Sequence, residues 1–189
     1  RSVESLTFKK GEFTFTKSKS SGDWVLSDLP EIEVPEEIQQ KVNQQIGPNS
    51  DGRVPEKYKD LISTKISFAT TLSNGKVALT PNAKIYAYLP TDQNFGFSFL
   101  LNGDFIPDGS RDKLFWDLDW NRYLFEEAGY QFILWLKNLW EKFKDGSCNQ
   151  IIPDLHRLIS ESTDEEKTNY LRLFENGLTK GIAEIFFIP

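Results

Sequence analysis

The stretch FGFSFLLNGDFIPDGSRDKLFWDLDWN, residues 95–121, predicts a strand, a turn and the start of a helix in succession. Its first part, FGFSFLLNGDFI, is apolar at neighbouring positions, which is typical of a strand covered on both faces in the centre of a sheet. Its middle, PDGSRDK, has the composition of a turn. Its last part predicts a helix that begins near Asp119, a residue type suited to the N-cap. Arg111 therefore stands in a turn directly after the most apolar strand of the chain.

The residues before this stretch are rich in strand signals. Two alternating runs around Lys10-Gly11 predict a hairpin, and TKISFATTL and KVALT, joined by SNGK, predict another. The run AKIYAYLP alternates in the same way. A short helix is predicted in PEEIQQKVNQQI, because Pro35 suits a first helical turn and the glutamates after it lie near the positive end of the helix dipole.

The residues after this stretch change to a helical period. A broad apolar stripe runs along WNRYLFEEAGYQFILWLKNLWEKF and consists of Leu124, Phe125, Ala128, Phe132, Trp135, Leu136 and Leu139. Further helices are predicted in IIPDLHRLIS and STDEEKTNYLRLFENGLTKGI, and a short strand in EIFFIP. This order of strands and helices indicates an α+β fold. We expect one compact unit, with a mixed β-sheet from residues 1–112 covered by helices from residues 113–189.

Composition and charge narrow the class of protein. The chain has 189 residues and a net charge of −6, which argues against a nucleic-acid-binding module, since such modules usually carry a basic face. The single cysteine, Cys148, excludes an internal disulfide and a zinc site built from cysteines, and it fits a reducing, cytoplasmic setting. No apolar run reaches the length of about 18 residues that indicates a transmembrane helix, so we expect no membrane partner.

Residues that could complete a reaction are missing from the sequence. The single histidine, His156, has no Gly-x-Ser-x-Gly motif to serve, and neither a phosphate loop nor a Gly-x-Gly-x-x-Gly motif is present. The acidic pairs have simpler explanations. Glu126 and Glu127 are adjacent on a helix and point to different sides, and Asp117 and Asp119 suit the start of a helix. We expect no metal site and no complete active site in this chain.

One run of the sequence carries a specific resemblance. The pieces YAYLPT, FGFSFLLNGDFI, the Ser-Arg turn, WN and the acidic LFEE follow one another between Val77 and Glu127. Together they resemble the segment that follows the ATP-binding domain in sacsin-like proteins, a branch of the gyrase–chaperone–histidine-kinase group of ATPases. In that family a separate head domain holds ATP and magnesium with an Asn-bearing helix and Gly-rich lid motifs, none of which stands in this sequence.

The resemblance implies that the chain is a fragment of a larger ATPase: its middle, transducer-like segment, without a cofactor of its own and partnered by the N-terminal ATP-binding domain. It also implies a ribosomal-protein-like β-α-β unit. In the related ninety-kilodalton heat-shock chaperones, a similar turn supplies an arginine that reaches the γ-phosphate. Ser110, Arg111 and Asp112 stand at the matching positions, whereas Gly109 replaces a β-branched residue. Arg111 is thus the implied catalytic residue, acting on ATP held by the head domain, with Ser110 as a binding residue.

Simpler roles stay open for these residues. The alternative for Arg111 is a surface ion pair with Asp108 or Asp112, which contributes about 0–1 kcal/mol. Asn102 and Asp104, at the end of the central strand, are secondary binding candidates. Their alternative is to end the strand by hydrogen-bonding to their own backbone.

The second hypothesis is a protein–protein interaction module without enzymatic activity. In it the aromatic helix YQFILWLKNLW docks a client protein or a second copy of the chain, with Trp135, Trp140 and Phe143 as anchors. The alternative is that these side chains form the core. Burial separates the two, because only an exposed aromatic patch can bind a partner. Trp120 and Asn121, in contrast, are expected to anchor the start of the long helix.

Overall fold

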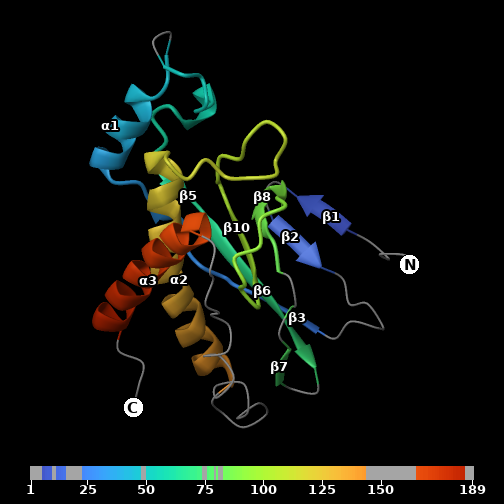
Figure 1. Ribbon diagram of the computed structural model, residues 1–189. Helices are drawn as coiled ribbons and strands as arrows, with labels where there is room; N and C mark the ends of the chain where they lie inside the picture. Colours follow the sequence, from blue (N-terminus) through green and yellow to red (C-terminus); the bar gives the residue numbers. More distant parts are fainter. Residues whose placement is uncertain are drawn as a thin grey trace.

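The computed structural model describes residues 6–9, 12–15, 23–47, 50–73, 76–78, 80, 83–143 and 165–185. The helix predicted in IIPDLHRLIS, the closing strand predicted in EIFFIP, and the surroundings of Cys148 and His156 lie outside the described residues. Within them the predicted α+β fold is confirmed: a mixed sheet packs against two long helices (Figure 1).

In the described part of the chain, the main sheet has six strands. Their order is β3 (Asp23–Leu26), β6 (Ile66–Ser73), β10 (Leu100–Gly103), β8 (Ile85–Ala87) and β9 (Leu89–Pro90), and β7 (Lys76–Ala78) also pairs with β6. β10 lies between β6 and β8, antiparallel to the first and parallel to the second. The prediction that this apolar run supplies a central strand is therefore confirmed.

The central strand is shorter than the sequence predicts. Only β10 joins the ladder, whereas residues 95–99 have no regular secondary structure and Gly96 adopts a φ of +77°. A residue in this left-handed region interrupts an extended strand, and glycine adopts it at little cost. The side chains of Phe95, Phe97 and Phe99 are still buried. The alternate phenylalanine side chains of this segment therefore pack in the core, although its backbone does not join the sheet.

Two smaller strand pairs are β1 (Leu6–Lys9) with β2 (Glu12–Phe15) and β4 (Ile32–Glu33) with β5 (Ser63–Thr64). The first pair matches Lys9 with Glu12, and β6 and β7 match Ser73 with Lys76. In both pairs the partner strands are two residues apart in the sequence, which agrees with the two predicted hairpins. The parallel strands β8 and β10 are joined by residues 88–99, which contain no helix, so these two strands do not form the β-α-β unit that the resemblance implies.

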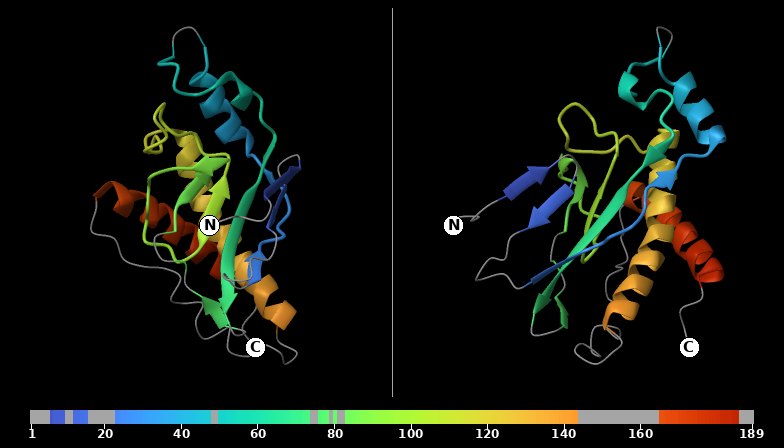
Figure 2. Two further views of the ribbon diagram at one scale, coloured as in Figure 1. Left: turned by 90° about the vertical axis from the view of Figure 1, so that its right-hand side faces the viewer. Right: turned by 180° about the vertical axis from the view of Figure 1, so that it is seen from behind.

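Two long helices cover one face of the main sheet. α2 (Asp119–Phe143) and α3 (Glu165–Glu184) lie side by side there in the views of Figures 1 and 2. The shorter α1 (Glu36–Gln44) and the 3-10 turn η1 (Glu56–Tyr58) lie at the same end of the molecule as the loop between β10 and α2 (Figure 1). Both predicted starts are correct to within one residue: Pro35, predicted in the first turn of α1, is its N-cap, and Asp119, predicted as an N-cap, is the first residue of α2.

Aromatic rings dominate the core between the sheet and these helices. Phe68 of β6 stacks on Trp135 of α2 with ring centroids 5.3 Å apart, and Phe99 stacks on Phe132 at 4.8 Å. Phe174 of α3 meets Phe132 at 5.7 Å. None of these five side chains is more than 1% exposed. Their burial is a large apolar contribution to stability, and it assigns Trp135 to the core.

Glycines allow α2 and α3 to approach each other closely. A Cβ placed on Gly129 would lie 2.0 Å from the carbonyl oxygen of Phe174, and one placed on Gly177 would lie 1.8 Å from that of Glu126. Real Cβ atoms do not come this close to backbone oxygens, since interiors are already packed to contact. The two helices therefore touch backbone to backbone at this crossing.

Candidate functional site

The carboxyl ends of β8 and β10 meet at one edge of the main sheet, since the two strands are parallel neighbours. Tyr88 directly follows β8, and Asp104 directly follows β10. The Tyr88 hydroxyl donates a hydrogen bond of 2.5 Å to Oδ1 of Asp104, and the Thr64 hydroxyl of β5 donates one of 2.8 Å to Oδ2. Both carboxylate oxygens of Asp104 are thus held by hydroxyl donors from other elements.

The backbone of Asp104 ties two further elements to this edge. Its carbonyl oxygen accepts a 2.7 Å hydrogen bond from Nε1 of Trp120, at the start of α2, and a 3.0 Å bond from the hydroxyl of Tyr58 in η1. The Tyr58 and Trp120 rings also pack edge to face, with centroids 5.5 Å apart, and both side chains are buried. Asp104 therefore joins the central strand, the long helix and η1 at one point.

Arg111 reaches the same edge from the loop between β10 and α2. Its Nη2 donates a 2.9 Å hydrogen bond to the carbonyl oxygen of Ala87, the last residue of β8. Arg111 and Tyr88 both adopt left-handed backbone, with φ of 65° and 64°. Such a conformation costs a bulky residue about 1–3 kcal/mol and persists only where the surroundings impose it, often at functional sites. Two strained residues side by side make this edge the candidate site.

The turn that carries Arg111 is braced by its own side chains. The Ser110 hydroxyl lies 3.0 Å from Oδ1 of Asp108 and 2.8 Å from Oδ2 of Asp112. The backbone N–H of Arg111 donates to the carbonyl of Asp108 at 3.1 Å. Within the described part of the chain Arg111 forms no ion pair, so the predicted alternative of a pair with Asp108 or Asp112 is not found. Its Nε is buried without a hydrogen-bond partner.

A second cation lies beside the two tyrosines. Nζ of Lys57 is 4.9 Å from the ring centroid of Tyr58 and 5.1 Å from that of Tyr88, within the range of cation–π attraction. The hydrogen bond to Asp104, burial and the charge of Asp104 raise the pKa of Tyr88 to about 12. Burial and the same charge raise the pKa of Tyr58, whereas the positive charge of Arg111 opposes that rise. Both phenols are therefore protonated donors at neutral pH.

We refer to these residues together as the Asp104 site, which consists of Lys57, Tyr58, Thr64, Tyr88, Asp104, Arg111 and Trp120. It contains one carboxylate and two cations. Neither cation has a carboxylate partner among the described residues. The site therefore carries net positive charge on a chain whose overall charge is negative.

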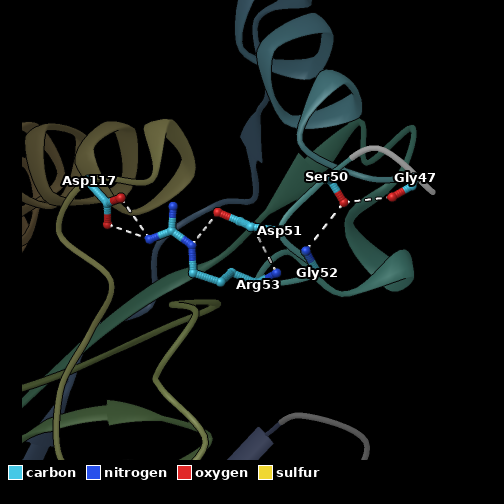
Figure 3. A network of polar contacts seen from close by, with 6 residues as sticks. All are labelled: Gly47, Ser50, Asp51, Gly52, Arg53 and Asp117. Atoms are coloured by element: carbon cyan, nitrogen blue, oxygen red, sulfur yellow. Dashed lines mark hydrogen bonds and ion pairs between the residues drawn. The ribbon is translucent and has the colours of Figure 1, made fainter.

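A separate polar network fixes the loop before η1 to the segment that leads into α2 (Figure 3). Arg53 donates from Nη1 to both carboxylate oxygens of Asp117, at 2.7 and 2.8 Å, and from Nε to Asp51 at 2.6 Å. Its guanidinium also lies 5.2 Å from the ring centroid of Phe115. Because two carboxylates already bind it, Arg53 is less suited than Arg111 to receive an anion.

The predicted site residues divide between this site and other places. Arg111 and Asp104 belong to it, and Ser110 braces the turn beside it. Asp104 does not end its strand by bonding to its own backbone, because its carboxylate binds side chains of β5 and of the segment after β8. Asn102 takes no part in the Asp104 site, and its Oδ1 is buried without a hydrogen-bond partner.

Four residues of the Asp104 site are not predicted by the sequence analysis: Lys57, Tyr58, Thr64 and Tyr88. The alternation of AKIYAYLP places Tyr88 on a strand face and gives no sign of a left-handed backbone. The useful signal is the order of the strands. Residues that directly follow adjacent parallel strands lie side by side, so a correct pairing of β8 with β10 would have brought Tyr88 to Asp104.

The aromatic helix offers little surface for docking. Trp135 is 1% exposed and Trp140 is partly buried, while the side chain of Phe143 lies outside the described residues. Trp135 is therefore not free to anchor a partner. A cleft of about 400 Å³ does lie between α1, α2 and α3. It is lined by acidic and basic side chains alike, among them Glu127 and Arg122, and it contains no residue of the Asp104 site.

Comparisons with known proteins found no matching family model, no matching curated protein and no matching solved structure. The described residues contain no group of three or more His, Cys, Asp or Glu side chains placed to hold a metal ion. Among the helices of the described part, none has the length and apolar character needed to cross a membrane. The geometry of the Asp104 site is therefore the main basis for a functional proposal.

Proposed function

We propose that this chain is the middle, transducer-like segment of a sacsin-like or chaperone-like ATPase, and that Arg111 acts on ATP held by the N-terminal ATP-binding domain of the same protein. The contacts of the Arg111 side chain give this proposal its strongest support. Its side chain is fixed to the carbonyl of Ala87, yet it has no carboxylate partner within the described residues, although Asp108 and Asp112 flank it. A fixed cation without a counter-ion suits an anionic ligand.

The chemistry of phosphoryl transfer explains the value of such an arginine. The reaction requires stabilisation of charge on the γ-phosphate oxygens more than covalent help. A guanidinium presents a planar fork of N–H donors that matches phosphate oxygens. In Arg111 the bond to Ala87 engages Nη2 and Nε is buried. The remaining amino N–H groups are the donors that would meet the phosphate.

Placing this arginine on a segment apart from the nucleotide makes its contribution depend on domain closure. ATP favours the closed state in this scheme, because only the closed state adds the contact with Arg111. The turn is held by Ala87 and by the bridge between Pro107 and Leu114, so closure is transmitted to the sheet and from there to a client protein or a second copy. The single cysteine fits the cytoplasmic setting of such an ATPase.

The test is ATP hydrolysis by the full-length natural protein that carries this sequence. Arg111→Ala is expected to lower kcat by about 100-fold or more, the size of effect seen when one charge-stabilising donor is lost. Arg111→Lys should recover only part of the rate, because an ammonium lacks the planar fork. Arg122→Ala, an exposed arginine of α2 outside the Asp104 site, is the matched control. An unchanged turnover number in Arg111→Ala would contradict the proposal.

The alternative function, a non-enzymatic interaction module, has less support. Its central anchor, Trp135, stacks on Phe68 in the core. A partner that used this side chain would have to open the contact between α2 and the sheet, at the cost of the apolar surface buried there.

A further inference from the structure

Lys57 is the residue of the Asp104 site whose position the proposed function does not explain. It belongs to η1, between Glu56 and Tyr58. Tyr58 is buried and bonded to the carbonyl of Asp104, so the backbone beside Lys57 is held at the site. Its ammonium lies over the rings of Tyr58 and Tyr88, and Lys57 as a whole is exposed to solvent.

The acidic residue next to Lys57 in the sequence is engaged elsewhere. Glu56 pairs with Lys59, at 3.8 Å, and Lys57 forms no ion pair with any described residue. Two lysines of one short turn therefore differ: Lys59 pairs with a carboxylate, whereas Lys57 turns to the aromatic rings beside Asp104. A cation–π contact holds an ammonium in place but leaves its charge uncompensated.

Lys57 and Arg111 both contact the segment around Tyr88, one at a side chain and the other at the backbone. Lys57 lies over its ring, and Arg111 binds the carbonyl of the preceding residue, Ala87. The ammonium of Lys57 lies over the ring of Tyr58 as well. A ligand with negative charge on successive groups suits two such cations better than a single carboxylate does, because it can neutralise both at once.

We propose that Lys57 is the second cation of a polyphosphate-binding site that it forms with Arg111. This inference rests on the proposed function and extends it: Arg111 meets the phosphate at which charge develops, and Lys57 binds another part of the phosphate chain. Lys57 is thus a positioning residue, which fixes how the nucleotide phosphates lie against this segment. The simpler role for Lys57 is a cation–π contact that only supports the fold. In that role Lys57 binds no anion.

The experiment measures binding of inorganic tripolyphosphate to this chain by calorimetry, at low salt. The wild-type chain is expected to bind it weakly, and more weakly as salt is added. Lys57→Ala should weaken binding about tenfold, the effect of one lost charge-assisted contact. Lys57→Arg should stay within about threefold of wild type, because it keeps the charge. Lys59→Ala, in the same turn but paired with Glu56, should leave the affinity unchanged.

Several results would overturn the inference. The inference is wrong if the wild-type chain does not bind tripolyphosphate. It is also wrong if Lys57→Ala and Lys59→Ala bind tripolyphosphate with the same affinity. Melting temperatures check that both variants are folded. The two proposals fail separately. If Arg111→Ala leaves ATP hydrolysis of the full-length protein intact while Lys57→Ala still loses tripolyphosphate, the ATPase role fails and the anion site stands. If Arg111→Ala abolishes hydrolysis but Lys57→Ala binds normally, only the role of Lys57 fails.

Discussion

Tyr88 and Asp104 lie 16 residues apart in the sequence and are joined by a 2.5 Å hydrogen bond, because each directly follows one of two parallel strands. Tyr88 reaches the carboxylate with a left-handed backbone, at φ +64°. The hydrogen bond therefore offsets part of the cost of that conformation. It also places the tyrosine ring under the ammonium of Lys57.

Removal of the Tyr88 hydroxyl should destabilise the chain modestly. In Tyr88→Phe, Asp104 keeps the bond from Thr64 but loses the one from Tyr88. We expect the free energy of unfolding to fall by about 1 kcal/mol, less than the value of about 1.5–3 kcal/mol usual for a bond to a charged group, because Tyr88 is 51% exposed. Urea unfolding measures it. Tyr86→Phe, a half-buried tyrosine of β8, should change the stability less, and equal losses in the two variants would argue against the bond.

The same hydrogen bond predicts a loss of stability at alkaline pH. The folded state raises the pKa of Tyr88 from 10.0 to about 12, so it favours the protonated phenol. Its contribution is fully present below pH 10 and declines as the pH rises from about 10 to 12. The measurement is urea unfolding of wild type and Tyr88→Phe at several pH values. The difference between the two proteins separates the contribution of Tyr88 to the free energy of unfolding from that of the other tyrosines. The two stabilities should converge toward pH 12, and parallel curves would show that Tyr88 is not coupled to Asp104.

Local signals were enough to predict most helices and hairpins. Each of these signals depends only on residues that are close together in the sequence: the Asn-Gly pair between β6 and β7, Pro35 before α1, and the apolar stripe of α2. The length of the central strand was predicted wrongly because apolar residues 95–99 pack into the core without joining the ladder. Apolarity indicates burial, but it does not distinguish a paired strand from an irregular segment.

The candidate site was predicted only where its residues lie in one contiguous run. Asp104 and Arg111 stand in the same stretch, and their sequence context was sufficient to single them out. Lys57 and Tyr58 join them through hydrogen bonds and ring contacts across long sequence separations. Such contacts depend on the parallel pairing of β8 with β10, a tertiary feature that neither composition nor alternation reports.

The crossing of α2 and α3 should not tolerate a methyl group. Gly129→Ala and Gly177→Ala would each place a Cβ within about 2 Å of a backbone carbonyl of the other helix, at 2.0 and 1.8 Å. The backbones must then separate, so we expect a loss of about 3 kcal/mol or more in the free energy of unfolding. Gly109→Ala is the control, since nothing lies within 4 Å of its added Cβ. A crossing variant as stable as the control would show that the helices can move apart freely.

Asn121 is expected to be the most sensitive polar side chain at the start of α2. It is fully buried; its Oδ1 accepts from the N–H of Ile106 at 2.8 Å, and its Nδ2 donates to the carbonyls of Ile106 and Phe115 at 2.8 and 2.9 Å. Asn121→Ala leaves the N–H of Ile106 without its partner, and the carbonyls of Ile106 and Phe115 keep only longer bonds, of 3.3 and 3.4 Å, from the N–H groups of Phe115 and Leu118. We expect a loss of about 2 kcal/mol or more in the free energy of unfolding. Asn138→Ala, an exposed asparagine of α2, should be neutral or slightly stabilising, because alanine favours the helix. Thermal or urea unfolding compares the two, and equal stability would mean that the loop from Phe105 to Phe115 finds other partners.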